Sequence, residues 1–154
     1  VKLINSKIGK NDYLIHLGDV GDLSYMEQIK GRPSRRILIK GNHDAGNAKY
    51  ENLFGHIYKA PIIVGPKIIL SHEPIDTVLE LGMVNLHGHV HNSIYNKDPY
   101  HYNFCADSIN FIPVNLNQWL NEGNLAEIDS LHRQVINYAT QHSIRKKEKQ
   151  DYGN

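Results

Sequence analysis

The sequence predicts an α/β fold built on an open sheet. Short runs rich in Ile, Leu and Val recur along the chain, and each ends in glycine or in polar residues. None of these runs alternates strictly with polar residues, which is typical of strands that are buried on both faces. The predicted strands span residues 13–17, 36–40, 67–70, 83–86, 101–106 and 111–116.

Helices are predicted before and between these strands. Residues 1–8 have apolar side chains at helical spacing, and residues 23–30 form a helix between the first two strands. A short helix is expected near residues 118–120, followed by a longer amphipathic helix from 124 to about 142. Residues 145–154 are charged and predict a frayed tail. A strand–helix–strand layout binds ligands just beyond the carboxyl ends of its strands.

The composition fits one domain spanning residues 1–154, because 154 residues with 40% hydrophobic content bury a single core. The formal charge of +1 gives no overall attraction for nucleic acid or for an anionic membrane. No apolar run approaches the roughly 20 residues that span a bilayer. The single cysteine, Cys105, excludes an intrachain disulfide and, with the other features, favours a cytoplasmic location.

Side chains that bind metals follow four of the predicted strands. Each motif is weak alone, since Gly-Asp and Asn-His-Asp are common turn sequences and a lone histidine is more often a buried structural residue. Because the strand ends of an open sheet lie together, we expect the polar residues of these motifs to converge. The four motifs are Gly18-Asp19, Gly41-Asn42-His43-Asp44, Ser71-His72 and His87-Gly88-His89-Val90-His91.

The last motif carries the strongest single signal. If the segment is extended, His87, His89 and His91 share one face, and Gly88 allows close approach of the backbone. A purely structural role would leave several ring nitrogens without partners, which favours metal binding. Within this segment, His87 is interpreted as the residue that closes the strand. Another histidine, His16, is interpreted as a satisfied core residue.

The ordered series Gly-Asp, Gly-Asn-His-Asp, Ser-His and Gly-His-Val-His resembles the calcineurin-like metallophosphoesterase superfamily, in particular its small single-domain bacterial and phage-encoded members. The resemblance covers residues 13–116. It implies a layered sandwich with a mixed sheet and helices on the outside. It also implies a hydrolase acting on phosphomonoesters or phosphodiesters of small molecules or nucleotides, through a metal-bound hydroxide at a dinuclear centre.

The resemblance also assigns ligands to two divalent ions, with manganese expected first and iron, zinc or nickel as alternatives. Asp19 would bridge the two ions. Asn42, His72 and His89 would complete the shell of one ion, and His91 would belong to the other. A bridging carboxylate, an amide oxygen and imidazoles form a ligand set that suits divalent transition metals.

Two further residues receive catalytic roles from the same resemblance. His43 would face the scissile phosphate and stabilise the leaving oxygen, and Asp44 would orient the His43 ring. Nearby arginines, Arg32, Arg35 and Arg36, are assigned to a solvated loop in preference to a phosphate site.

One family motif, Asp-x-His on the first strand, is absent from these 154 residues. Only Asp19 and His91 then remain for one ion, so we expect one well-held ion and a weak second site. The first strand is therefore expected to be missing, as in a fragment of a longer enzyme. Natural truncation, or a neighbouring subunit that supplies the strand, are the less favoured explanations. The hypothesis is that the intact enzyme hydrolyses phosphate esters and that this piece does so poorly.

Two alternatives remain at this stage. Metallo-β-lactamase-like hydrolases also use histidine-rich strand ends, but they continue His-x-His with Asp-His, whereas Asn92-Ser93 follows here. The other is a catalytically weak or inactive metal-binding remnant that acts as an interaction module. A nucleic-acid-binding protein has little support, because aromatic and basic residues are not interleaved on a recognisable platform.

Overall fold

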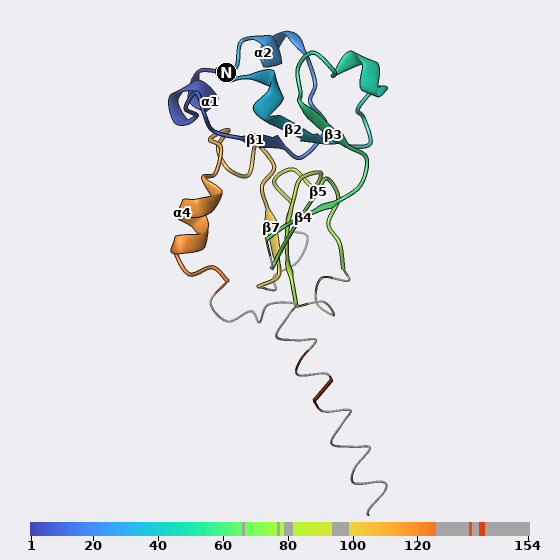
Figure 1. Cartoon of the computed structure of the whole chain (residues 1–154), viewed down its shortest axis with the longest axis vertical. Helices are drawn as coiled ribbons and strands as arrows, with labels where there is room; N and C mark the ends of the chain where they lie inside the picture. The colour runs from blue at the N-terminus through green and yellow to red at the C-terminus, as the bar shows by residue number, and fades with distance from the viewer. Residues whose placement is uncertain are drawn as a thin grey trace, which may run out of the picture.

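Two β-sheets, one above the other in Figure 1, form the centre of the protein. The computed structural model describes residues 1–65, 67–76, 78, 82–93, 99–125, 136 and 139–140. The first sheet is parallel, in the order β1-β2-β3. The second has the order β4-β5-β6-β7 and is mixed, because β4 runs antiparallel to β5 while the other pairs are parallel. The strands are β1 (Leu14–His16), β2 (Arg36–Ile39), β3 (His56–Tyr58), β4 (Ile62–Val64), β5 (Ile68–Ser71), β6 (Val84–His87) and β7 (His101–Asn103).

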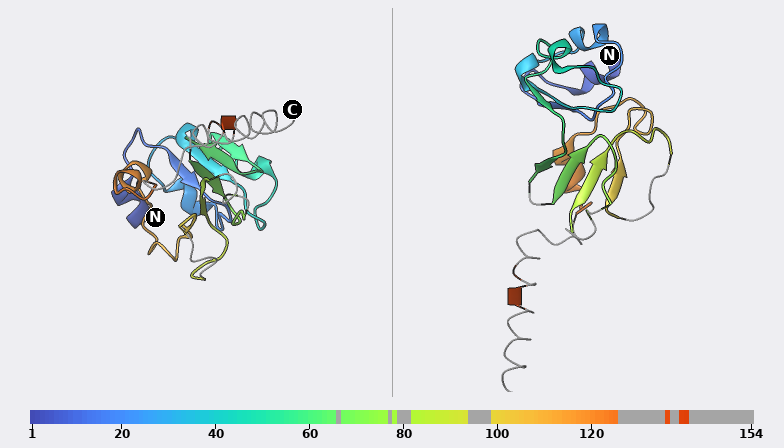
Figure 2. Two further views of the ribbon diagram at one scale, coloured as in Figure 1. Left: turned by 90° about the horizontal axis from the view of Figure 1, so that it is seen from below. Right: turned by 90° about the vertical axis from the view of Figure 1, so that its right-hand side faces the viewer.

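Short helices cover the outside of these sheets (Figures 1 and 2). Helices α1 (Lys2–Lys7) and α2 (Ser24–Glu27) accompany the first sheet, together with the 3₁₀ turns η1 (Pro33–Arg35) and η2 (Asn47–Lys49). Helix α4 (Leu116–Asn121) lies beside the second sheet, and its first turn is capped by the Asn115 side chain, which accepts a hydrogen bond from the Gln118 amide. Within the described residues, no helix is long and apolar enough to cross a membrane.

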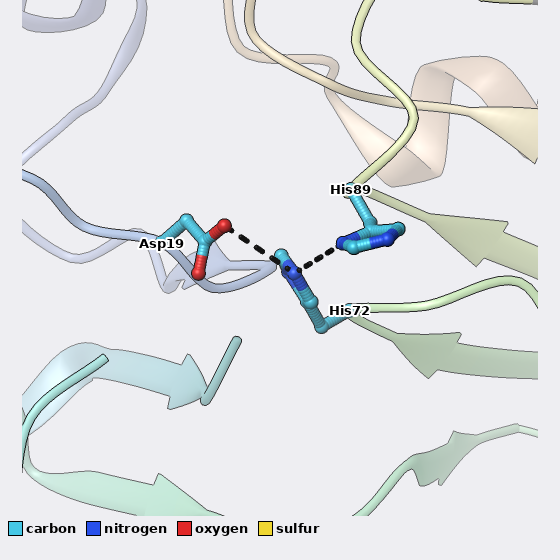
Figure 3. Close-up of side chains that lie close together, drawn as sticks. All are labelled: Asp19, His72 and His89. Carbon is cyan, nitrogen blue, oxygen red and sulfur yellow. Dashed lines mark hydrogen bonds and ion pairs between the residues drawn. The ribbon is translucent and has the colours of Figure 1, made fainter. Parts of the chain in front are cut away.

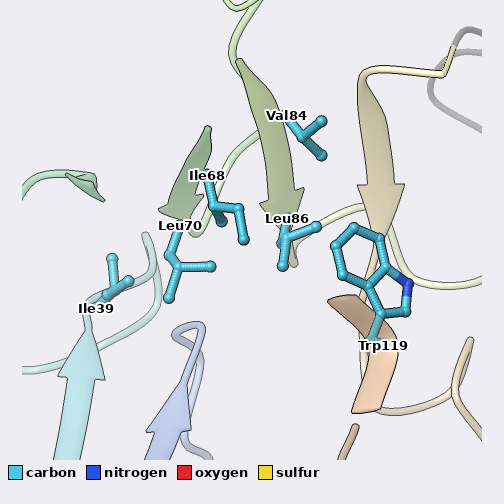
Figure 4. Packing of buried hydrophobic residues seen from close by; sticks show 6 residues of the cluster. All are labelled: Ile39, Ile68, Leu70, Val84, Leu86 and Trp119. Atoms are coloured by element: carbon cyan, nitrogen blue, oxygen red, sulfur yellow. The ribbon is translucent and has the colours of Figure 1, made fainter. Parts of the chain in front are cut away.

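A hydrophobic cluster joins the two sheets (Figure 4). Ile39, at the end of β2, lies at one end of this cluster and Trp119 of α4 lies at the other, with side chains of the second sheet between them. The buried members are Ile39, Ile68, Leu70, Val84, Leu86 and Trp119. The indole is also in edge-on contact with Tyr102 and Phe104. Because this core includes the last residue of β2, it holds the carboxyl ends of β2, β5 and β6 near one another.

A second cluster packs the outer helices onto the first sheet. Its buried residues are Met26, Ile29, Leu38, Tyr50, Leu53 and Phe54, and Ile4 and Ile8 pack against it. The helical spacing of the N-terminal apolar residues is therefore confirmed by α1. A helix is also found within the predicted range 23–30, but it is shorter than predicted, since α2 has four residues.

Most of the predicted strands are confirmed, with limits that are narrower or, for β5 and β6, shifted by one residue. The strand predicted at 111–116 is wrong, because Asn110 and Phe111 have φ values of 54° and 59° and turn the chain toward α4, which begins at Leu116. The sequence analysis missed β3 and β4, each three residues long and half exposed. The helix over 124–142 lies mostly outside the described residues, and the tail over 145–154 lies wholly outside them.

Arg36 is the first residue of β2 and does not lie in a solvated loop. Its side chain is only 4% exposed. The guanidinium donates hydrogen bonds at 2.5–3.4 Å to four backbone carbonyls, those of Met26, Ile29, Gly31 and Leu53. It therefore connects α2 and the loop after η2 to the start of β2, the central strand of the first sheet, which is a structural role.

We predict that Arg36→Ala lowers the free energy of unfolding by about 2–4 kcal/mol, because it leaves buried carbonyls without a donor. Urea denaturation followed by circular dichroism measures this loss. Arg32→Ala is the matched control, since Arg32 is exposed and its replacement should change stability by less than about 0.5 kcal/mol. Equal effects of the two substitutions would contradict the structural role.

Candidate metal centre

The candidate site lies where the carboxyl ends of β1, β2, β5 and β6 meet. The chain leaves β1 through Gly18 and Asp19, which have φ values of 92° and 53°. The amide of Gly88, just after β6, donates to the carbonyl of His72, just after β5, at 2.9 Å. These connections bring segments from both sheets into one cluster, of which Figure 3 shows Asp19, His72 and His89.

Four side chains place one ligand atom each around a common point. The Nε2 atom of His72 lies 2.9 Å from Asn42 Oδ1, 3.1 Å from His89 Nδ1 and 3.5 Å from Asp19 Oδ2. Asn42 Oδ1 is in turn 3.1 Å from His89 Nδ1. The ligand atoms of Asp19, His72 and His89 all lie within 4.8 Å of one another. The structure thus brings together four of the five metal ligands that the sequence suggested.

The hydrogen bond of His72 Nδ1 determines which ring nitrogen faces the cluster. Its Nδ1 atom lies 2.7 Å from the carbonyl oxygen of Leu17, and since a carbonyl only accepts, Nδ1 must carry a hydrogen. Nε2 is then the ring nitrogen that faces the acceptor oxygen of Asn42 and the carboxylate of Asp19, and it offers a lone pair to a cation when the ring is neutral. Facing acceptors are stabilised by a cation between them. Two imidazoles, an amide oxygen and a carboxylate fit a divalent transition metal.

Two glycines make this close approach feasible. A Cβ atom on Gly18 would lie 2.5 Å from His72 Nδ1, and one on Gly41 would lie 2.7 Å from His72 Cε1. A Cβ on Gly41 would also meet the side chain and the amide of Asp19. The Gly-Asp and Gly-Asn-His-Asp motifs therefore need glycine for packing as well as for turning the chain.

Asp44 joins the loops that carry the ligands. Its Oδ2 accepts from the amides of Asp19 at 2.9 Å and Gly41 at 2.8 Å, and its Oδ1 accepts from the amide of Val20 at 3.0 Å and the hydroxyl of Tyr50 at 3.1 Å. Burial by itself would raise the pKa of Asp44, but these hydrogen bonds together lower it below its ordinary value. Within the described residues, the His43 ring is not among its hydrogen-bond partners.

His43 lies beside the cluster with its side chain exposed. Its backbone amide donates to Asp19 Oδ1 at 3.0 Å, so the same carboxylate that faces His72 also positions the His43 loop.

The histidine-rich motif does not form the single extended face expected from its spacing. Strand β6 ends at His87, which is 1% exposed and packs edge-on against His101. His89 and His91 have φ values of 68° and 50°, which are left-handed and not extended conformations. The interpretation of His87 as the residue that closes the strand is confirmed, and burial lowers its pKa.

His91 lies apart from the four-atom cluster. Its side chain is 84% exposed, and its Nδ1 atom lies 3.2 Å from Oδ2 of Asp107. The sequence analysis did not select Asp107, because this residue follows the motif by sixteen positions in a turn with no recognisable pattern. His16 also differs from expectation, since its buried Nδ1 has no hydrogen-bond partner among the described residues, and burial lowers its pKa.

The fold and the site define an α/β protein with a cluster of side chains at its strand ends whose chemistry suits a divalent cation. The sequence profile of the calcineurin-like phosphoesterase family matches residues 1–151, so the chain belongs to this family. Metal-dependent hydrolysis of phosphate esters is the activity that the family implies. The resemblance seen in the motifs is thereby confirmed.

A solved structure shares the fold. The crystal structure of the protein of unknown function AQ665 from Aquifex aeolicus is similar with a TM-score of 0.57 and 24% identity, over 78% of this chain and 81% of that chain. Among curated proteins, none matches the sequence significantly.

We predict that Gly41→Ala weakens divalent-cation binding by at least about tenfold, because the added methyl group displaces Asp19 or His72. It should also cost about 1–3 kcal/mol of stability, as overpacking does. Gly46→Ala is the matched control, since nothing lies within 4 Å of its added carbon. Calorimetric titration with Mn²⁺ measures the affinity, and equal binding by both variants would refute the packing argument.

We predict that Asp44→Asn lowers the free energy of unfolding by about 2–4 kcal/mol, because an amide group cannot accept all of these hydrogen bonds. The effect has a pH signature. Since the pKa of Asp44 is lowered from 3.8 on folding, its contribution is complete above pH 3.8 and is lost as the pH falls through the folded-state pKa. Urea denaturation at several pH values should therefore show a loss of stability in acid for the unmodified protein that is absent in the Asp44→Asn variant. His43→Asn, at an exposed position, should change stability by less than about 0.5 kcal/mol.

Proposed function

We propose that the chain hydrolyses phosphate esters of small molecules or nucleotides at a centre for two divalent cations. The observation that carries the proposal is the convergence of Asp19, Asn42, His72 and His89, each with one potential ligand atom, on one point. Membership of the calcineurin-like phosphoesterase family supports the reaction type. Divalent cations bound there would polarise the phosphoryl group and activate a water molecule.

The two proposed cation positions have different numbers of ligands. Asn42, His72 and His89 hold the first cation together with Asp19, whose two oxygens point to different partners, Oδ2 to His72 and Oδ1 to the His43 amide. His91 serves the second cation with Asp19. Because the 154 residues contain no Asp-x-His, this second position has fewer ligands and binds more weakly. Manganese is the expected metal, with iron, zinc or nickel as alternatives.

His43 and Asp44 contribute to catalysis from the same loop, His43 at the phosphate and Asp44 through the backbone. The exposed His43 ring donates a hydrogen bond or a proton to the leaving oxygen of the ester. The hydrogen bonds of Asp44 are directed at backbone amides, so its contribution to orienting His43 acts through the loop that carries both residues.

A pocket beside the metal ligands supports a small anionic substrate. It has a volume of about 340 Å³ and is bounded by Asn42 and His72 together with Lys40 and Lys59. This volume lies at the lower end of the range for small-molecule sites, roughly 300–1,000 Å³. Two lysines and one carboxylate, that of Glu73, line its wall, so the charged side chains together favour the negative charge of a phosphate ester.

The second candidate function is a metal-binding interaction module with little or no turnover. One observation favours it: His91 lies outside the four-atom cluster, so within the described residues only the first position has a full set of convergent ligand atoms. Turnover separates the two functions, because the module needs one bound cation and no hydrolysis.

We predict one tight Mn²⁺-binding event, a weaker second event, and slow Mn²⁺-dependent hydrolysis of an aryl phosphodiester or an aryl phosphomonoester. His72→Asn should weaken the tight event by at least about 10–100-fold and abolish turnover, since His72 contributes a central ligand atom. His56→Asn is the matched control, because His56 is an exposed histidine on β3. Titration calorimetry and release of the aryl alcohol provide the two measurements.

Each outcome decides between the candidates. Tight binding with turnover supports the hydrolase, and tight binding without turnover supports the module. Absence of Mn²⁺ binding in the unmodified chain, or its persistence in His72→Asn, refutes the metal centre.

A further inference from the structure

We propose that Asp107 is a positioning residue that orients His91 toward the second cation; this inference rests on the proposed function. The carboxylate accepts the Nδ1 hydrogen of His91 and leaves Nε2 as the ring nitrogen with a free lone pair. Asp107 thereby becomes part of the site although it belongs to none of the four motifs.

The contact is direct and involves a ring that packing does not hold. His91 Nδ1 lies 3.2 Å from Asp107 Oδ2. The His91 side chain is 84% exposed, whereas that of Asp107 is 27% exposed. An exposed imidazole rotates freely unless a hydrogen bond fixes it, so the carboxylate determines where this ring points.

The backbone of His91 is fixed by the same segment that carries Asp107. The carbonyl of His91 accepts hydrogen bonds from Asn103 Nδ2 at 2.5 Å and from Ser108 Oγ at 2.6 Å. Its φ value of 50° is left-handed, a conformation that non-glycine residues adopt when their surroundings impose it. Asn103 and Ser108 therefore fix the backbone at His91.

The side chain of Asp107 is also held in place by a hydrogen bond. Its Oδ1 accepts from the Ser108 amide at 3.1 Å, which directs Oδ2 at the imidazole. The neighbouring Cys105 lies against the same turn: burial raises the pKa of its thiol, and the amides of His91 and Val90 act in the opposite direction. Both partners of the contact are thus anchored before any cation binds.

The chemical consequence follows from the tautomers of imidazole. A neutral ring has one N–H, and a carboxylate stabilises the tautomer with that hydrogen on Nδ1. Nε2 is then the nitrogen that binds a cation, and the carboxylate increases its basicity. His72 follows the same rule, with the Leu17 carbonyl in place of the carboxylate. The added negative charge matters most at the position with fewer ligands.

The first test reads the tautomer without any metal. Long-range ¹H–¹⁵N correlation spectra of the metal-free chain, at a pH where the rings are neutral, identify the protonated nitrogen of each histidine; His91→Gln assigns the signal. We expect Nδ1–H for His91 in the unmodified chain and a shift toward Nε2–H in Asp107→Ala. An Nε2–H tautomer in the unmodified chain overturns the proposal.

The second test reads the affinity of the weaker Mn²⁺ event. Asp107→Ala should weaken it by about 10–100-fold and leave the tight event unchanged. Asp107→Asn keeps an acceptor oxygen without the charge, so it should retain the Nδ1–H tautomer and show an intermediate affinity. Glu51→Ala, at an exposed position, is the control for a lost carboxylate.

These outcomes separate this inference from the proposed function. If the unmodified chain binds two Mn²⁺ ions and Asp107→Ala binds both equally well, the role of Asp107 is refuted and the hydrolase is not. If the unmodified chain binds no second ion, the dinuclear proposal fails and the positioning role fails with it. Should Asp107→Ala not fold, Asp107→Asn decides, because an unchanged weak event in that variant contradicts the contribution of charge.

Discussion

The carboxylate of Asp44 is the interaction on which the geometry of the site depends. It accepts hydrogen bonds from amides in two loops, one after β1 and one after β2, and so holds Asp19 next to the segment of Asn42. Hydrogen bonds to a charged acceptor are among the stronger ones in proteins, and those here are partly buried. A ligand set drawn from distant segments needs such a fixed frame, since small displacements of ligand atoms weaken metal binding.

Hydrophobic packing between the sheets completes this frame. Asp44 joins only the loops of the first sheet, whereas His72 and His89 follow strands of the second. Ile39 packs across the boundary between the sheets, and the Leu17 carbonyl accepts a hydrogen bond from the His72 ring. The candidate metal centre therefore lies at the boundary where apolar burial brings the two sheets together and polar contacts orient its side chains.

The two proposed cation positions differ in how many side chains converge on them and in how firmly these side chains are oriented. The first has four convergent ligand atoms, and its central histidine is oriented by a backbone carbonyl. The proposed second position would use the other oxygen of Asp19 and the exposed His91, whose ring contacts Asp107. This difference gives a physical basis for unequal affinities, because pre-oriented ligands lose less conformational entropy on binding.

The sequence by itself determined the fold class, most of the strands and four side chains of the candidate centre. Apolar runs that end in Gly-Asp, Gly-Asn-His-Asp and Ser-His mark strand ends, and such signals are local, so they can be read along the chain. The tertiary structure decided what depends on distant neighbours: the short strands β3 and β4, the turn at Asn110 and Phe111 in place of a strand, and the burial of Arg36. It also decided that His89 and His91 adopt left-handed conformations and that Asp107 lies against His91. Contacts between residues far apart in the chain arise only when the sheets pack, and no local pattern of residue types encodes them.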